Sequence, residues 1–147
     1  KNQMDRNILE KSYDDAKYIK REMQIEDEDL YTCWVGSDFY AEGIKCGEWL
    51  ETYLKKAGRD SEKIDIVLIE GTAGASATIG RTAGLMKVIE RNPLWNLAAV
   101  RGGEFEKGSG KIAMDSAVKE TENIDVVIAE NDNMIFGTMN SMDAAGI

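Results

Sequence analysis

The chain alternates short apolar runs with longer stretches in which apolar residues recur at helical spacing. Short runs of aliphatic, β-branched and aromatic residues are typical of buried strands, and the helical spacing is typical of helices with one face on a core. Strands are expected at Leu30–Val35, Ile64–Ile69, Leu94–Val100 and Asp125–Glu130. Helices are expected at residues 39–57, 76–91, 109–121 and 133–145.

This regular alternation of strand and helix predicts an α/β fold. Short connections and nearly uninterrupted apolar strands indicate a mostly parallel sheet covered by helices on both faces, a three-layer αβα sandwich. In such a sheet the loops that follow the strands gather at the carboxyl edge, where open α/β sheets bind their ligands. The polar residues that follow each expected strand are therefore the candidates for a functional site.

The loop at Gly71–Ser76 contains mainly small residues and leads into the helix that carries Arg81. Backbone N–H groups at a helix start, with an arginine about one turn later, suit a small polar ligand. A phosphate site is disfavoured, because the loop has neither the Gly-Lys-Ser/Thr ending of a P-loop nor the glycine spacing of a dinucleotide fingerprint. A purely structural role for the glycines, in a sharp turn and in close helix packing, is an equally good interpretation.

Three other residues follow expected strands, and each has a structural and a functional interpretation. Asp38 is better interpreted as a helix cap than as an acid of a site. Phe105, in the middle of the loop RGGEFEKG, is either a core plug or a platform for stacking. Asn131 is either the cap of the last helix or a ligand-binding amide. Their common position with Arg81 at one sheet edge favours a ligand site over four separate structural roles.

Composition narrows the classes of function. The formal net charge of −9 argues against binding to nucleic acid or to anionic membrane surfaces. No apolar run reaches membrane-spanning length. The absence of histidine removes the Ser-His and Cys-His nucleophile systems and most zinc sites. Cys33 and Cys46 are interpreted as small buried hydrophobic residues in preference to a disulfide. Lysine- and carboxylate-based enzymes stay possible, but no paired-carboxylate or lysine motif stands out, and no catalytic residue, metal ligand or cofactor is assigned.

The remaining polar groups suit a carbohydrate. An arginine fork, an asparagine amide and a carboxylate donate and accept hydrogen bonds in fixed planar geometries, which match the neighbouring hydroxyls of a sugar. An aromatic ring offers an apolar surface for the C–H side of a sugar ring. Discrimination by such groups is large, because each buried group left unpaired costs about 1–3 kcal/mol.

The sequence resembles the type 1 periplasmic sugar-binding proteins of ABC importers, in particular the ribose-, galactose- and galactofuranose-binding group. The resemblance lies in the segments GTAGASATIGRTAGL, GEFEKGSGK and VIAENDNMIFGTMNSMDAAGI, supported by YTCWVGSDFYAEG and the early MDRN. It covers most of the chain except the charged stretch 13–30, which looks like an insertion. The family fold is the αβα lobe that the hydrophobic pattern predicts.

The resemblance also implies roles for individual residues. Asp5 and Arg6 match an Asp-Arg pair that hydrogen-bonds sugar hydroxyls, and Ala77 matches a small residue that lines the pocket. Arg81, Phe105 and Asn131 match the arginine, the aromatic residue and the asparagine that contact the sugar. Gly80 stands where close relatives often have an acid, and Glu104 stands where they have Asp, so the resemblance leaves the sugar open.

The same resemblance implies two lobes with the sugar between them. Residues 1–30 are expected to contain the end of the first lobe, the hinge and the charged insertion, and residues 31–147 are expected to form an incomplete second, C-terminal lobe. The expected function is that of a solute-binding component outside the cell membrane, in the periplasm or lipid-anchored. It would bind a pentose or hexose, the furanose form included, and deliver it to an ABC transporter permease. The missing first lobe is an expected partner.

Two alternatives remain at this point. The effector domain of a LacI-type repressor shares the fold and resembles these motifs, and a helix-turn-helix region upstream would favour it. An α/β enzyme domain acting on a small polar substrate is the second alternative. A titratable catalytic group at the strand ends would favour the enzyme.

Overall fold

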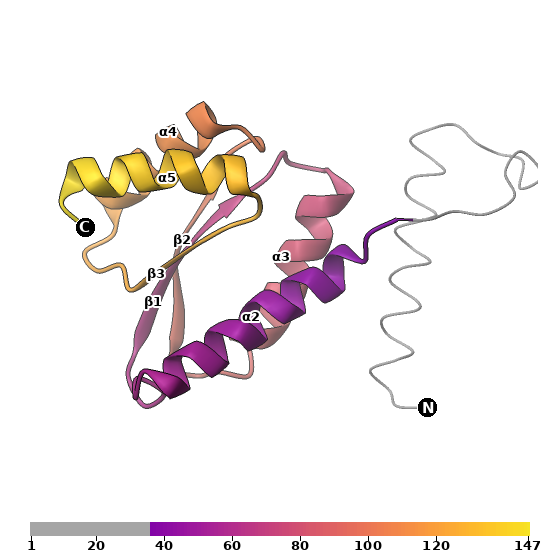
Figure 1. Cartoon of the computed structure of the whole chain (residues 1–147), viewed down its shortest axis with the longest axis vertical. Helices are drawn as coiled ribbons and strands as arrows, with labels where there is room; N and C mark the ends of the chain where they lie inside the picture. The colour runs from indigo at the N-terminus through magenta and orange to yellow at the C-terminus, as the bar shows by residue number, and fades with distance from the viewer. Residues whose placement is uncertain (1–35) are drawn as a thin grey trace, which may run out of the picture.

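The computed structural model describes residues 36–147, which alternate between helix and strand (Figure 1). The elements are α2 (Phe39–Lys56), β1 (Ile64–Glu70), α3 (Ser76–Ile89), β2 (Trp95–Gly102), α4 (Lys107–Glu120), β3 (Val126–Ala129) and α5 (Asp132–Ala145). Three of the four predicted strands and all four predicted helices are therefore confirmed, with ends that differ by at most two residues. The predicted strand at Leu30–Val35 lies outside the described residues.

The described strands form a parallel sheet in the order β2-β1-β3. The central strand β1 pairs on one side with β2, from Ile64 opposite Trp95, and on the other side with β3. Because all three strands run the same way, the loops that follow them emerge at one edge of the sheet. This edge is the one at which the sequence places the candidate site.

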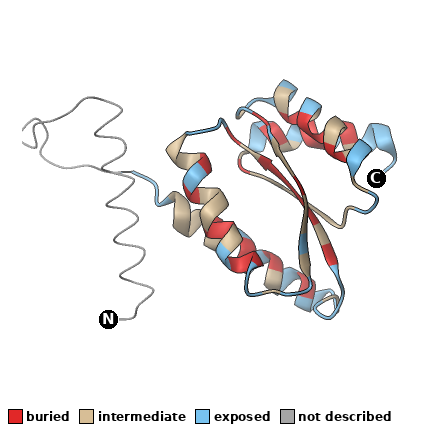
Figure 2. Cartoon of the chain, turned by 180° about the vertical axis from the view of Figure 1, so that it is seen from behind, coloured by how far each residue is buried: buried red, intermediate tan, exposed pale blue. Residues whose placement is uncertain are grey.

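Helices cover both faces of the sheet, as Figures 1 and 2 show, so the predicted three-layer αβα sandwich is confirmed. Alternate residues of β1 point to opposite faces, as in any strand. Ile64, Ile66 and Leu68 pack with α2 and α3, whereas Val67 and Ile69 pack with α4 and α5. The strand is completely buried at these five positions, so it forms the centre of the hydrophobic core.

The helix ends follow the capping chemistry in the sequence. The Asp38 carboxylate accepts a hydrogen bond from Ala41 N at 2.9 Å and caps α2, which is the preferred interpretation of this residue. Gly58, with φ of 72°, follows the end of the same helix in the left-handed region that glycine adopts readily. Helix α4 starts at Lys107, two positions before the expected residue. The prediction missed this first turn because its sequence, Lys-Gly-Ser-Gly, has the composition of a loop.

Glycines allow the two helices on each face to approach closely. A Cβ atom added to Gly84 of α3 would lie 2.1 Å from the carbonyl oxygen of Tyr40 in α2. A Cβ atom added to Gly137 of α5 would lie 1.9 Å from the carbonyl oxygen of Lys107 in α4. Real Cβ atoms do not approach backbone atoms so closely, so glycine is required at both crossings. Close helix packing, one structural role expected of the glycines, is confirmed.

Two apolar residues that helical spacing places on the buried face of a helix are exposed in the structure. The spacing places Ile112 on the same face as Ala113 and Ala117, but its exposed fraction is 71%. Ile79, in the first half of α3, is 44% exposed. The buried positions of α3 include Gly80 and Gly84, and those of α4 include Gly110 and Ala113, so small residues occupy the close helix crossings while Ile79 and Ile112 lie outside the buried face.

Candidate functional site

The candidate site is built on three loops at the carboxyl edge of the sheet. They follow β1, β2 and β3 and span residues 71–75, 103–106 and 130–131. The first loop passes directly under the Phe105 ring, since a Cβ atom on Gly71 would lie 1.9 Å from Cζ of that ring. The loop then turns through Gly74, whose φ is 83°. The contact between Gly71 and the Phe105 ring thus joins the first loop to the second.

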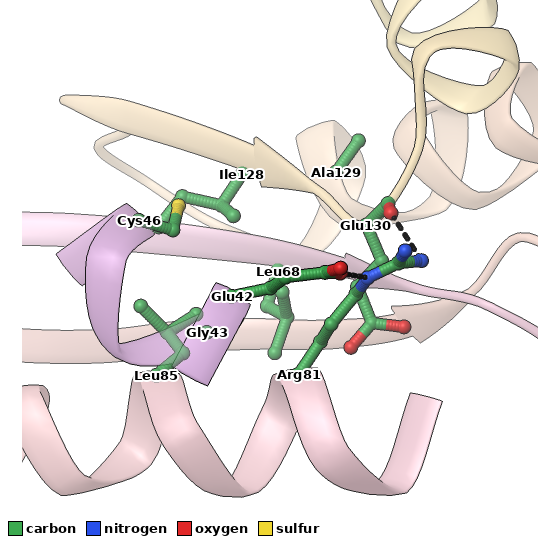
Figure 3. Close-up of a pocket in the computed structure, with 9 residues that line it drawn as sticks. All are labelled: Glu42, Gly43, Cys46, Leu68, Arg81, Leu85, Ile128, Ala129 and Glu130. Carbon is green, nitrogen blue, oxygen red and sulfur yellow. Dashed lines mark hydrogen bonds and ion pairs between the residues drawn. The ribbon is translucent and has the colours of Figure 1, made fainter. Parts of the chain in front are cut away.

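Arg81 reaches from α3 to the end of β3 (Figure 3). Its Nη1 donates to the carbonyl oxygen of Glu130 at 2.9 Å, and its Nε donates to the Glu42 carboxylate at 2.8 Å. The guanidinium carbon lies 5.0 Å from the centre of the Phe39 ring, within cation–π distance. Among residues 36–147, Nη2 has no hydrogen-bond partner. The guanidinium is thus fixed on one side and keeps donors for another group.

The loop that carries Phe105 has an unusual backbone. Glu104 and Phe105 have φ of 51° and 58°, the left-handed region that residues with a Cβ atom seldom adopt. Hydrogen bonds hold this conformation: Gly103 N donates to the Glu70 carbonyl at 2.7 Å, and Asn131 Nδ2 donates to the Phe105 carbonyl at 3.0 Å. Strained backbone of this kind gathers at binding and active sites.

The partly buried Phe105 ring packs against the core cluster between the sheet and helices α4 and α5. Its contacts with the described residues therefore agree with the first of its two interpretations, a side chain that plugs the core. The ring also covers Gly71, so it fixes the first loop of the site. A stacking role toward a ligand stays a prediction.

Asn131 caps α5, which confirms one of the two interpretations of this residue. Its Oδ1 accepts from Met134 N at 2.9 Å at the start of α5, while its Nδ2 holds the Phe105 loop. An amide has a second N–H and a second lone pair, so capping leaves it able to bind a ligand.

Ala77 lies partly exposed in the first turn of α3. The two other predicted site residues, Asp5 and Arg6, lie outside the described residues.

Sequence reasoning missed a pair of carboxylates at this edge. Glu130, 9% exposed, accepts from Gly71 N at 2.7 Å through Oε2. Its Oε1 lies 2.9 Å from Thr82 Oγ1, which also lies 2.6 Å from Glu70 Oε1. Burial raises the pKa of Glu130. The two glutamates are far apart in the sequence, and only their common position at the ends of paired strands would have indicated this cluster.

A cavity of about 150 Å³ opens beside this cluster, between α2 and the end of β3. Its apolar part is lined by Leu68, Leu85 and Ile128, and Arg81 and Glu130 line its polar end (Figure 3). The volume is below the roughly 300–1,000 Å³ of pockets that enclose a small molecule. The described residues therefore do not enclose a ligand of that size at this cavity.

Cys46 also lines this cavity. The residue is exposed and its thiol is free, so its assignment to the buried hydrophobic residues was wrong. The buried stripe of α2 consists instead of Gly43, Gly47, Leu50 and Leu54. Cys33 lies outside the described residues.

The described part of the chain also bears on metal binding and on membrane insertion. Residues 36–147 contain no group of three or more Cys, Asp or Glu side chains arranged to hold a metal ion. None of the helices in this range has both the length and the apolar character needed to cross a membrane.

Comparison with known proteins identifies the family to which this αβα fold belongs. The sequence profile described as "Periplasmic binding protein domain" matches residues 12–147. The chain is 30% identical over 132 residues to the galactofuranose-binding protein YtfQ of Escherichia coli, covering 88% of this chain and 40% of that protein.

Solved structures give the same result. A crystal structure from Mycobacterium smegmatis in complex with β-D-fucofuranose has 37% identity and a TM-score of 0.74, over 82% of this chain and 39% of that one. The periplasmic binding protein component of the arabinose ABC transporter from Shewanella, bound to L-arabinofuranose, has 33% identity and a TM-score of 0.73, over 84% and 39%.

The chain therefore belongs to the periplasmic binding protein family. The resemblance to its type 1 sugar-binding members is confirmed by these relatives, which are sugar-binding proteins. The chain spans about two fifths of their length.

Proposed function

We propose that the chain is the second lobe of a solute-binding component of an ABC transporter, which binds a monosaccharide between two lobes. The observation that carries the proposal is the convergence of Arg81, Phe105 and Asn131 from three segments onto one edge of a parallel sheet. Relatives at least 30% identical that bind galactofuranose, fucofuranose and arabinofuranose support a pentose or hexose, with the furanose form as the first choice.

Each of these residues supplies one element of sugar recognition. Arg81 keeps Nη2 for sugar hydroxyls while its salt bridge and its bond to the Glu130 carbonyl fix its direction. Asn131 keeps one N–H and one lone pair. Phe105 and Ala77 supply apolar surface for the ring carbons. Because these groups are held before the ligand arrives, binding loses less free energy to ordering them.

The division into lobes is part of the same proposal. Residues 31–147 form the second lobe, and residues 1–30 carry the hinge, the charged insertion and the end of the first lobe, where Asp5 and Arg6 bind sugar hydroxyls. Two observations support it: the cavity at the carboxyl edge is too small to enclose a sugar by itself, and the chain matches two fifths of its relatives' length. The protein works outside the cell membrane, delivers the sugar to a permease and catalyses no reaction.

The test uses the full-length protein, purified without bound sugar. Isothermal titration with L-arabinose, D-galactose, D-fucose and D-ribose is expected to give micromolar or tighter binding for one or two of them and much weaker binding for the rest. Chromatography of the recovered sugar is expected to show it unchanged. Failure of every pentose and hexose to bind would contradict the proposal, and conversion of the sugar would favour an enzyme.

A further inference from the structure

Three side chains meet beneath the first loop of the site: Glu70 at the end of β1, Thr82 in α3 and Glu130 after β3. The Thr82 hydroxyl oxygen lies 2.6 Å from Glu70 Oε1 and 2.9 Å from Glu130 Oε1. The other oxygen of Glu130 accepts from Gly71 N at 2.7 Å. The cluster thus connects the ends of two strands to the first residue of the loop.

The number of hydrogens available decides how the three side chains can be joined. A threonine hydroxyl has a single hydrogen, so it can donate to only one of the two carboxyl groups. The second short O···O contact is a hydrogen bond only if one carboxyl group is protonated and donates to Thr82. Without that proton, two oxygen lone pairs would face each other at this distance.

Burial favours Glu130 as the carboxyl group that holds this proton. Thr82 donates its single hydrogen to Glu70 Oε1, the shorter of the two contacts at 2.6 Å. The 2.9 Å contact is then the Glu130 O–H donating to Thr82. Glu130 is the buried one of the two acids, and burial disfavours the charged form of a carboxyl group.

The groups around Glu130 change its pKa in opposite directions. Burial is the largest influence and raises its pKa, and the Glu70 charge on β1 raises it further. The Gly71 N–H, the Thr82 hydroxyl and the Arg81 charge on α3 lower it, but the Arg81 charge is partly neutralised by Glu42 of α2. The net shift is upward.

We propose that Glu130 is a positioning residue: its protonated side chain donates to Thr82, Thr82 donates to Glu70, and this relay fixes Gly71 and the loop that follows. The relay acts through the loop. The inference rests on the proposed function, since the loop matters because it presents the backbone of residues 71–75 and the helix of Arg81 to a sugar.

The sign of the pH dependence follows from the raised pKa. A carboxyl group with a higher pKa in the folded than in the unfolded chain contributes stability that is fully present below the unfolded pKa, about 4.3 for Glu. That contribution disappears as the pH rises through the folded pKa. The Glu130–Thr82–Glu70 relay is therefore expected to be complete in acidic solution and to break above the Glu130 midpoint, where the ionised carboxylate can no longer donate to Thr82 although it still accepts from Gly71 N.

The experiment is an NMR titration of the chain 1–147, labelled with ¹³C at the glutamate carboxyl carbons and with ¹⁵N, between about pH 4 and about pH 8. The Glu130 carboxyl resonance is expected to titrate above the ordinary midpoint of Glu. The Gly71 amide resonance is expected to shift with the same midpoint. In Glu130→Gln, whose amide donates to Thr82 and accepts from Gly71, the Gly71 resonance should stay near its acidic position at every pH.

Two further variants separate the relay from a general effect on the fold. Thr82→Val removes the hydroxyl that connects the two acids and should change the Glu130 midpoint, whereas Thr82→Ser should retain it. Glu122→Gln, at an exposed glutamate, should leave Gly71 and Glu130 unchanged. The wild-type titration decides the matter even if a variant fails to fold.

A Glu130 midpoint at or below that of an ordinary glutamate would overturn the inference, as would a Gly71 amide that does not follow it. None of these measurements requires a sugar. If the titration succeeds and the full-length protein binds no sugar, the proposed function alone is wrong. If the sugar binds and Glu130 titrates normally, the relay alone is wrong.

Discussion

Replacing Gly84 with alanine is expected to lower the free energy of unfolding by about 3 kcal/mol or more, at the upper end of overpacking effects. The new Cβ atom would lie 2.1 Å from the Tyr40 carbonyl oxygen and 2.9 Å from Ile44 N. Both are backbone atoms of α2, which cannot rotate away as the end of a side chain can. Helices α2 and α3 would have to separate, and the apolar core beneath them would lose contact.

Gly108→Ala is the matched control, because it makes the same change inside a helix where no atom lies within 4 Å of the added Cβ. It should leave the stability nearly unchanged or raise it by up to about 1 kcal/mol, the difference in helix propensity. Urea unfolding of the chain 1–147, followed by circular dichroism, measures both variants. Equal stabilities for Gly84→Ala and the wild type would show that the two helices are not held at this crossing.

Replacing Arg81 with alanine is expected to weaken sugar binding by the full-length protein by about 1.5–3 kcal/mol, the range for hydrogen bonds of charged groups. This corresponds to a roughly ten- to hundredfold increase in the dissociation constant. The cause is the loss of the Nη2 donors that the Glu42 salt bridge and the Glu130 carbonyl aim at the site. Isothermal titration with the preferred sugar measures the change.

Arg91→Ala is the control for the loss of an arginine and its ion pairs. Arg91 also joins α3 to α2, through Glu51 and Glu48, but at the opposite end of the helix from the site. Its removal should leave the affinity unchanged, and a urea titration of both variants accounts for any loss of stability. If Arg81→Ala binds the sugar as tightly as the wild type, the role of Arg81 is structural.

The order of elements was predictable from the sequence because strands and helices alternate with clear hydrophobic patterns. The central strand shows this most directly, since residues 64–69 are apolar apart from Asp65 and form the buried middle of the sheet. The end of β3 was less predictable. Glu130 belongs to the predicted strand, but the strand ends at Ala129, and the glutamate turns to Gly71 and Thr82.

The sequence predicts where the candidate site lies, but it does not predict the side-chain contacts within the site. Strand ends of a parallel sheet must lie together, so the pattern of strands and helices alone places Arg81 and Asn131 at one edge. The sequence carries no local signal for the Glu70–Glu130 pairing, which depends on β1 and β3 being neighbours in the sheet. Nor does it show that Phe105 would adopt a left-handed backbone and cover Gly71.

One further titration tests the central claim, that this chain is one wall of a monosaccharide site. Adding each sugar of the panel to the ¹⁵N-labelled chain 1–147 is expected to shift the amides of residues 71–77, 103–105 and 131, and to leave the opposite edge of the sheet unaffected. The dissociation constants should be millimolar or weaker. One lobe supplies only part of the hydrogen bonds, and the lost freedom of the ligand costs several kcal/mol.

Micromolar binding by the isolated chain would contradict the two-lobe account, because it would show that a single lobe suffices. Shifts confined to residues away from the three loops would contradict the location of the site. The account predicts weak binding at the carboxyl edge for the same sugar that the full-length protein binds tightly.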